Sequence, residues 1–450
     1  MGQSGDALIL MRPAFSFFAL IFVVTAGAAS DASGFLEEDS GISSIPPAEI
    51  NPYILAYEEI DSHALSAPAT ARASVKSLAA YLTKPAKNDR EKARAIFRWI
   101  AANIDYDVQV FFKGGSGLTA AGDVLKRGKS VCYGYSDLFL ALAEEAGLQA
   151  VMIRGYGKGY GYQPGQHFSG PSNHAWNAVL INGSWYLIDT IWGAGYVSGG
   201  GKYVRHFDDH YFMTPPTQFI YDHLPEDSSW QLLDSPISKE QFESLPYLES
   251  DFFNLGLELA GSSRGVIDAA GRANLSIYAP DGVLMTAGLE YAADAGGRTG
   301  LARRTFCQRQ GGRYEILAEL PEEGRYVLTA YGKRKGDSGE YSSVMEIGIN
   351  ASCGEDEGSG FPLAYSAFSR AGAYLFSPMQ GGLKAGESYW FRIRVPGAQQ
   401  VAVVSGEEWS YLTSRDGVFE GNATIKEDNV NICAKFQTGS FDCLLRYFAR

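Results

Sequence analysis

The spacing of the apolar residues changes once along this chain, near Gly147, and this change limits the folds that the chain can adopt. Before that point, residues 51–103 and 131–146 carry apolar side chains at the three- and four-residue spacing of amphipathic helices. Gly147 is a typical helix terminator. The side chains that we expect to face inward are Ile96, Phe97, Ile100, Leu138, Phe139 and Leu142.

After Gly147, short β-rich runs replace the helical pattern. Strands are predicted over residues 151–156, 174–181 and 185–191. The last two are joined by Asn182-Gly183, and Asn-Gly between alternating apolar runs is the strongest short-range signal for a hairpin. The sequence therefore predicts an α+β domain over about 51–238, with helices packed on an antiparallel sheet.

From residue 239 onward, alternating strands separated by Gly and Pro turns predict two β-sandwich modules, at 239–353 and 354–450. A weak repeat supports two modules, since the residues from Leu275 to Pro280 resemble those from Phe391 to Pro396. The acidic, glycine-rich stretch 354–360 is interpreted as the linker between them.

The amino terminus is typical of an export signal. Arg12 precedes an apolar stretch and small residues follow it, which predicts a signal peptide over 1–29 and a polar linker over 30–50. We therefore expect a secreted, periplasmic or extracellular protein with no integral membrane span once the signal is removed; an uncleaved anchor is the alternative. The net charge of −13 makes nucleic acid an unfavourable partner.

Export would permit disulfides, and the chain has five cysteines. Cys307 and Cys353 fall in one β-rich region, and Cys433 and Cys443 flank a predicted turn. These two local pairs would leave Cys132 as the free thiol. Four cysteines allow three connectivities, so the pairing stays open, as does the alternative of buried thiols.

Cys132, His174 and Asp189 follow one another in the order nucleophile, base and orienting acid. With a two-residue turn at Asn182-Gly183, His174 faces Ile191 and Asp189 faces Trp176. His174 and Asp189 then become diagonal neighbours on one sheet face, about 7 Å apart at the backbone. A register slip of one residue would send Asp189 to the opposite face. The same face would gather Trp176, Leu180, Trp185 and Leu187, a surface on which the Cys132 helix could pack.

Cys132 falls at the start of the predicted helix, where free amides and the helix dipole favour a thiolate. Ser130 is the expected N-cap. A buried structural cysteine is the alternative interpretation. The loop over 155–170, rich in Gly and Tyr, could bind substrate or cover the core of its own domain.

A metal site is a further alternative, because His206 and His210 lie four residues apart with Asp208 and Asp209 between them. On a helix, both histidines would face one ion. No third ligand is evident, so we expect no metal.

Three motifs resemble the transglutaminase-like superfamily, a relative of the papain-type cysteine proteases, and more closely its kyphoscoliosis peptidase group. They are residues 128–136 around Cys132, 173–179 around His174 and 185–195 around Asp189, and the stretch 211–232 also fits. The resemblance implies a papain/transglutaminase-like core followed by immunoglobulin-like modules. It also implies a catalytic triad of Cys132, His174 and Asp189, and a thioester intermediate without a cofactor. Within these motifs we expect Tyr133, Trp176 and Trp192 to contact substrate.

The sequence thus favours a cysteine-dependent enzyme that hydrolyses peptide or glutamine-side-chain amides in proteins or peptides. Capture of the same thioester by an amine would instead make it a cross-linking transglutaminase. A non-catalytic cell-surface scaffold, with the β modules as binding elements, is the alternative from a different class.

Overall fold

A computed structural model describes residues 57–449, apart from 116, 262–263, 293–297, 356–359, 427–428 and 438. The predicted signal peptide over 1–29 and the linker over 30–50 lie outside the described residues, as does most of the linker predicted at 354–360. None of the described helices combines the length and apolar character needed to span a bilayer. The described residues divide into two compact units: one runs to Ile237, and the other contains Gln163–His167 together with the chain from Ser238 onward.

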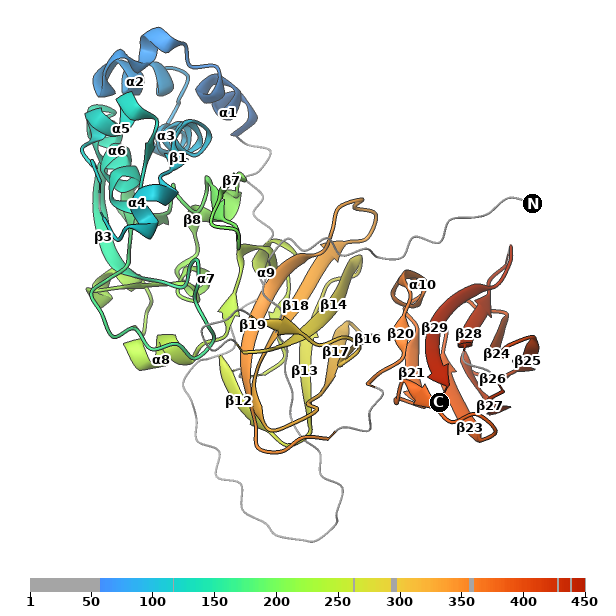
Figure 1. The fold of residues 1–450 in the computed structure, drawn as a ribbon. Helices are drawn as coiled ribbons and strands as arrows, with labels where there is room; N and C mark the ends of the chain where they lie inside the picture. The colour runs from blue at the N-terminus through green and yellow to red at the C-terminus, as the bar shows by residue number, and fades with distance from the viewer. Residues whose placement is uncertain are drawn as a thin grey trace. The chain divides into compact units, whose positions relative to one another are not determined.

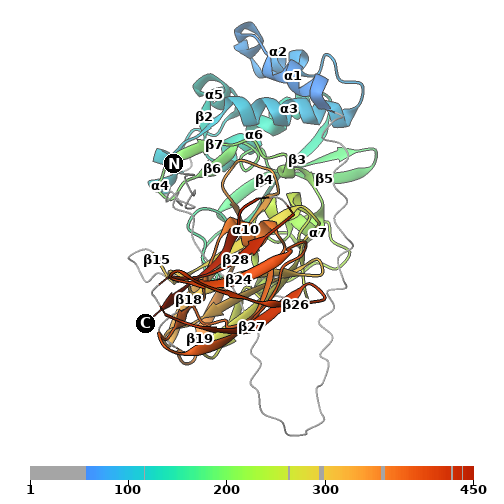
Figure 2. The same cartoon turned by 90° about the vertical axis from the view of Figure 1, so that its right-hand side faces the viewer.

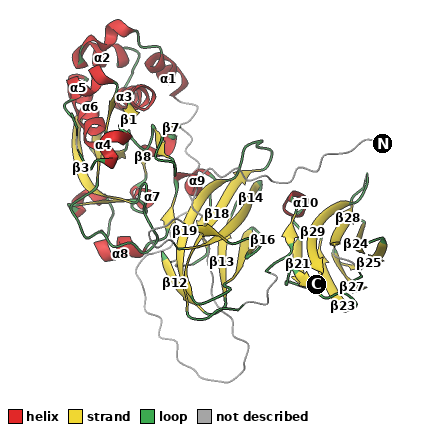
Figure 3. Cartoon of the chain, in the orientation of Figure 1, coloured by secondary structure: helices red, strands yellow, loops and turns green. Residues whose placement is uncertain are grey.

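The first unit begins with helices and continues with a sheet (Figures 1 and 3). Its helices are α1 (Glu58–Leu65), η2 (Ala69–Ala73), α2 (Val75–Leu82), α3 (Asp89–Asn103), α4 (Val108–Phe112), α5 (Ala121–Arg127), α6 (Cys132–Glu145), η3 (Asp209–Tyr211), α7 (Pro216–Phe219) and η4 (Ser228–Gln231). Its strands are β1 (Asp105–Tyr106), β2 (Lys129–Ser130), β3 (Gln149–Gly157), β4 (His174–Ile181), β5 (Ser184–Ile188), β6 (Gly195–Val197), β7 (Tyr203–Arg205), β8 (Phe212–Thr214) and β9 (His223–Pro225).

Five of these strands form an antiparallel sheet in the order β8-β5-β4-β3-β9. The helices α3 and α6 lie next to β3 and β4 (Figure 2). All six inward-facing residues expected from the helical spacing are completely buried: Ile96, Phe97, Ile100, Leu138, Phe139 and Leu142. The predicted arrangement of helices on an antiparallel sheet is confirmed.

The hairpin between β4 and β5 has the predicted register, with Ile181 opposite Ser184. Asn182 and Gly183 both have positive φ, as a two-residue turn of this type requires. The second strand is shorter than expected, because it ends at Ile188 and not at Ile191. The Asp189 amide instead donates to the Tyr211 carbonyl at 3.0 Å, so the chain leaves the β4 edge at this residue.

Two further expectations about the Cys132 helix are wrong. Ser130 lies in β2, and Val131 occupies the N-cap position without a side-chain cap. The helix also packs on the sheet face opposite to the one predicted. Asn177 is next to Trp176 in β4 and therefore lies on the other face, and its side chain donates to the Ser136 carbonyl of α6 at 3.1 Å. The face that carries Trp176 is covered by α7, whose Phe219 contacts the indole ring, and His223 from the edge strand β9 contacts the same ring.

The second unit contains two β modules (Figure 3). The first has α8 (Lys239–Ser244), β10 (Tyr247–Leu248), α9 (Ser250–Asn254), β11 (Glu258–Leu259), β12 (Val266–Ala269), β13 (Arg272–Tyr278), β14 (Val283–Tyr291), β15 (Thr299–Gly300), β16 (Thr305–Gln310), β17 (Arg313–Glu319), β18 (Gly324–Arg334) and β19 (Ser342–Ala351). The second has β20 (Leu363–Ala364), α10 (Ser366–Arg370), β21 (Tyr374–Ser377), β22 (Gly382–Leu383), β23 (Ser388–Arg394), β24 (Gln400–Ser405), β25 (Glu408–Tyr411), β26 (Thr413–Arg415), β27 (Val418–Thr424), β28 (Asn429–Lys435) and β29 (Asp442–Ala449).

The two modules have the same strand order. The sheet β10-β19-β18-β14-β15 corresponds to β20-β29-β28-β24-β25, and β11-β13-β17-β16 corresponds to β21-β23-β27-β26. A parallel strand joins each larger sheet at the same place, as β12 on β19 and β22 on β29. The weak repeat falls on β13 and β23, which are equivalent strands, so it reflects a repeated module.

Candidate active site

Cys132 is the first residue of α6, and only 7% of it is exposed. The first amides of a helix have no partner within the helix, and the dipole places partial positive charge there. The amide of Cys132 is one of these groups, which makes it the expected donor to an oxyanion.

Gly134 fixes the path of α6 beside the nucleophile. A Cβ atom at this position would lie 2.0 Å from Oγ of Ser130 and 2.9 Å from a methyl group of Val124. Any larger residue would therefore push the first turn of α6 away from β2 and α5. The glycine lets the helix carry Cys132 close to its neighbours.

His174 and Asp189 meet as the hairpin register predicts. His174 opens β4, Asp189 directly follows β5, and the His174 Nε2 to Asp189 Oδ2 distance is 2.6 Å. Both residues are buried, with 6% and 1% exposed. Cys132 is a hydrogen-bonding and electrostatic neighbour of the same imidazole. The three predicted catalytic side chains thus come together.

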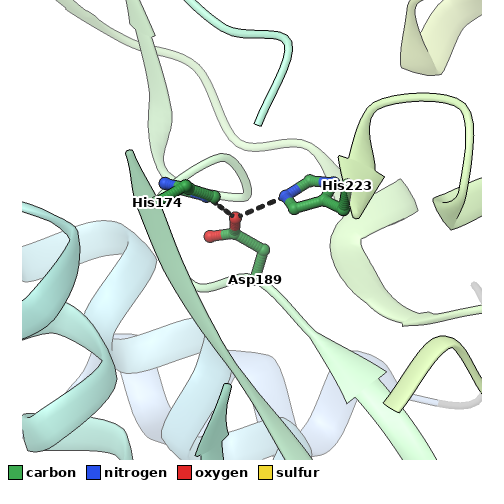
Figure 4. Close-up of side chains that lie close together, drawn as sticks. All are labelled: His174, Asp189 and His223. Atoms are coloured by element: carbon green, nitrogen blue, oxygen red, sulfur yellow. Dashed lines mark hydrogen bonds and ion pairs between the residues drawn. The ribbon is translucent and has the colours of Figure 1, made fainter. Parts of the chain in front are cut away.

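The Asp189 carboxylate accepts four hydrogen bonds. Oδ1 accepts from the amides of Ile191 at 2.8 Å and Trp192 at 3.0 Å. Oδ2 accepts from His174 and, at 3.0 Å, from His223 Nε2. Figure 4 shows the two imidazoles approaching this one oxygen from opposite sides. Four bonds satisfy a carboxylate fully, so its orientation is fixed from every direction.

These contacts determine the protonation of the pair. Burial disfavours the imidazolium, but the Asp189 carboxylate and then Cys132 outweigh this effect and raise the pKa of His174 to about 10. Burial also disfavours the carboxylate, yet His174 and His223 hold the pKa of Asp189 well below its usual range. The resting site is therefore an imidazolium between a carboxylate and the sulfur.

The sequence patterns do not single out His223, Asp222 or Tyr106 as members of the site. His223 bridges Asp189 and Asp222, and the pKa of Tyr106 is raised first by burial and then by the negative charges of Cys132 and Asp189. The stretch 211–232 contained His223 among its matching residues, but no local spacing reveals that β9 lies at the edge of β3.

The three residues expected to contact substrate have different positions. Trp176 is only 1% exposed and packs edge-on against Phe219 and His223, so the prediction that it contacts substrate is wrong. Trp192 is half-buried, and its ring centroid lies 5.1 Å from that of His174. Tyr133 is half-buried on α6, with the Arg154 guanidinium over its ring. Beside the His174–Asp189 pair, Trp192 is therefore the indole that is half-buried, not fully buried.

The aromatic residues of the loop between β3 and β4 differ in their exposure. Tyr162 and Phe168 are buried and stack on each other, so they cover the core. Tyr160 is 42% exposed and contacts the rings of Phe111 and Phe112 edge-on. Tyr162 and Phe168 therefore fit the interpretation that the loop covers the core, whereas substrate binding by this loop stays a prediction.

The alternative metal site is not formed. His206 lies in a loop and His210 in the short helix η3, so they do not share the face of an α-helix. Asp209 pairs with Arg94, and Asp208 accepts from the His210 amide at 3.0 Å. Among the described residues, the donor atoms close enough to share an ion are those of His174, Asp189 and His223, within 4.8 Å. Hydrogen bonds of 2.6 and 3.0 Å already occupy the shared oxygen, so this trio does not fit a metal.

The predicted disulfides are not present, because all five cysteines are free thiols. Cys307 lies in β16 and Cys353 follows β19, which belongs to the other sheet of the module. Cys433 and Cys443 do lie opposite each other on β28 and β29, with their sulfur atoms 2.8 Å apart.

Family models match two parts of the chain. Residues 76–190 match the transglutaminase-like superfamily, and residues 239–357 match the KY-like, immunoglobulin-like domain. The chain carries a transglutaminase-like domain followed by a KY-like, immunoglobulin-like domain. Cys132, His174 and Asp189 all lie within the first of these matches, residues 76–190.

Two similar proteins are kyphoscoliosis peptidase of Mus musculus and Hillarin of Drosophila melanogaster. The first is 35% identical over 64% of this chain and 42% of its own length. The second is 36% identical over 50% of this chain and 29% of its own length. The chain therefore spans less than half the length of these relatives, and their similarity concerns the shared domains.

Proposed function

We propose that this protein is a cysteine-dependent hydrolase that cleaves amide bonds of proteins or peptides through a thioester. The observation that carries the proposal is the buried Cys132–His174–Asp189 arrangement, in which Asp189 is held by four hydrogen bonds. A carboxylate fixed this firmly orients the imidazole and stabilises its charged form. The transglutaminase-like domain and the helix terminus at Cys132 both support the same chemistry.

The reaction begins with the thiolate of Cys132 and the imidazolium of His174. The sulfur attacks the amide carbon, and the carbonyl electrons move to the oxygen, where the Cys132 amide donates a hydrogen bond. When the tetrahedral intermediate collapses, the C–N bond breaks and His174 gives its proton to the leaving amine. Water then attacks the thioester, His174 takes its proton, and the acid leaves as the thiolate re-forms.

Water is the acceptor that the burial of the site favours. Only 7% of Cys132 and 6% of His174 are exposed, so an acceptor has to reach the thioester through little open surface. Water needs no binding surface of its own, whereas a lysine side chain on a second protein does. Transfer to an amine remains the alternative reaction of the same intermediate.

Alkylation of Cys132 by iodoacetamide, followed by peptide mass spectrometry across pH, tests the proposal. Cys353 is exposed in the same molecule and serves as an internal reference thiol. We expect Cys132 to react faster than Cys353 near pH 7, and His174→Ala to remove this advantage. If Cys132 reacts no faster than Cys353 although the protein is folded, the chain is a non-catalytic binding protein.

Product analysis separates hydrolysis from transfer. The wild type and Cys132→Ala are incubated with a peptide mixture and a labelled primary amine. We expect new carboxyl ends with the wild type alone. Label joined to glutamine by the wild type alone would replace hydrolysis with cross-linking. We further propose export, and the N-terminal sequence of the protein recovered outside the producing cell tests the cleavage predicted near residue 29.

A further inference from the structure

His223 is buried between two carboxylates. It opens β9, which pairs with β3, and it is only 1% exposed. Its Nε2 lies 3.0 Å from Oδ2 of Asp189, and its Nδ1 lies 2.6 Å from Oδ1 of Asp222. The Tyr211 hydroxyl donates to the other oxygen of Asp222 at 3.1 Å. Figure 4 shows the His223 ring directed at the same carboxylate as His174.

These contacts determine the number of protons on His223. An ionised carboxylate only accepts hydrogen bonds, so each ring nitrogen that faces one has to donate. Asp189 is ionised, and its four accepted bonds leave no place for a proton. Asp222 accepts from Tyr211, and its other oxygen faces Nδ1 of His223. With Asp222 ionised as well, both nitrogens of His223 carry hydrogen, and the ring is a cation.

The surroundings strengthen the effect of this charge. The ring of Phe219 stacks on His223 with centroids 3.9 Å apart, and the rings of Trp192 and Trp176 lie 4.3 and 5.0 Å away. These aromatic rings exclude water, and charges interact more strongly where no water screens them. The ionisable groups that face His223 are Asp189, Asp222, Tyr211 and His174, whose ring centroid is 5.2 Å from that of His223.

We propose that His223 is a positioning residue for the acyl transfer proposed above. As an imidazolium held by Asp222, it fixes the orientation of the Asp189 carboxylate. It also limits how strongly Asp189 retains the proton of His174. Both imidazoles share one oxygen of Asp189, so the negative charge of this oxygen is divided between them. Without His223, Asp189 would hold the His174 proton more tightly. The leaving amine would then receive that proton less readily.

Nuclear magnetic resonance of the wild-type full chain tests the charge directly. The chain has six histidines, and all of them are labelled selectively with ¹⁵N. The signals that disappear in the variant His223→Gln are those of His223. We expect hydrogen on both ring nitrogens of His223 at pH 7. An unprotonated ring nitrogen would overturn the proposal. This experiment does not depend on catalysis, so it stands even if Cys132 proves inert and the proposed function fails.

The pH dependence of turnover tests the positioning role. The double variant Asp222→Asn/His223→Gln removes one negative and one positive charge, and the new amide of residue 223 can still donate to Asp189. We expect the alkaline limb of the kcat profile to move up by about one pH unit and kcat to fall roughly tenfold, with KM unchanged. His63→Gln is the matched control, because His63 stacks on Tyr81 away from the site. A merely structural role would leave the alkaline limb in place, and that result would refute the proposal.

Discussion

Asp189→Asn is the substitution that most directly tests the electrostatics of the site. Four hydrogen-bond donors face the carboxylate, from His174, His223 and the amides of Ile191 and Trp192. An asparagine replaces one acceptor atom by an NH₂ group, so at least one donor then faces another donor. The variant also loses the charge that offsets the burial of His174. Breaking a buried ion pair in this way costs about 3–5 kcal/mol.

The sign of the pH dependence follows from the two shifts. The pKa of His174 is raised from 6.5 to about 10, so its stabilising contribution is complete below pH 6.5 and is lost as the pH rises towards 10. The pKa of Asp189 is lowered from 3.8, so its contribution is complete above about pH 4 and is lost at lower pH. Asp189→Asn should therefore cost most stability between about pH 4 and 6.5.

Two assays measure the consequences. Urea unfolding at several pH values gives the free energy of unfolding, and the pH profile of Cys132 alkylation gives the state of the His174–Cys132 pair. In the variant, burial is the dominant effect on His174, so its pKa falls and the alkaline limb of the alkylation profile moves to lower pH. Turnover should decrease by roughly 10²–10⁴-fold. Asp208→Asn is the control, since Asp208 caps η3 and asparagine caps a helix about equally well, so stability should change little. A variant that keeps wild-type stability and the wild-type alkaline limb would refute this account of the site.

Three other predictions concern the surrounding structure. Gly134→Ala should destabilise the protein by about 1–3 kcal/mol and slow Cys132 alkylation, because the methyl group meets Ser130; Gly122→Ala, in open space on α5, should be neutral or slightly stabilising in the same urea titration. Incubation with glutathione disulfide should link Cys433 to Cys443, and a mass spectrum without that cross-linked peptide would contradict the prediction. Treatment with a chelator should leave turnover unchanged, and a loss that added zinc restores would contradict the metal-free mechanism.

Local patterns in the sequence determined much of the site. Asn182-Gly183 set the register of one hairpin, and that register brings His174 and Asp189 to the same side. The change of spacing near Gly147 separated helices from strands, and the weak repeat identified two modules with one strand order. These features depend on neighbouring residues along the chain, so periodicity and turn chemistry are sufficient to predict them.

Tertiary structure decided what lies on each side of the sheet and what surrounds the triad. The alternation of side chains predicts two faces, but not which face receives α6, because that depends on how α7 returns to cover Trp176 and β9 returns to the edge of β3. The same return places His223 against Asp189, although 34 residues separate them. The expectation that Trp176 contacts substrate was wrong because a sequence does not show which aromatic residues become buried. The triad was therefore encoded locally, whereas its charge environment arises from contacts between distant segments.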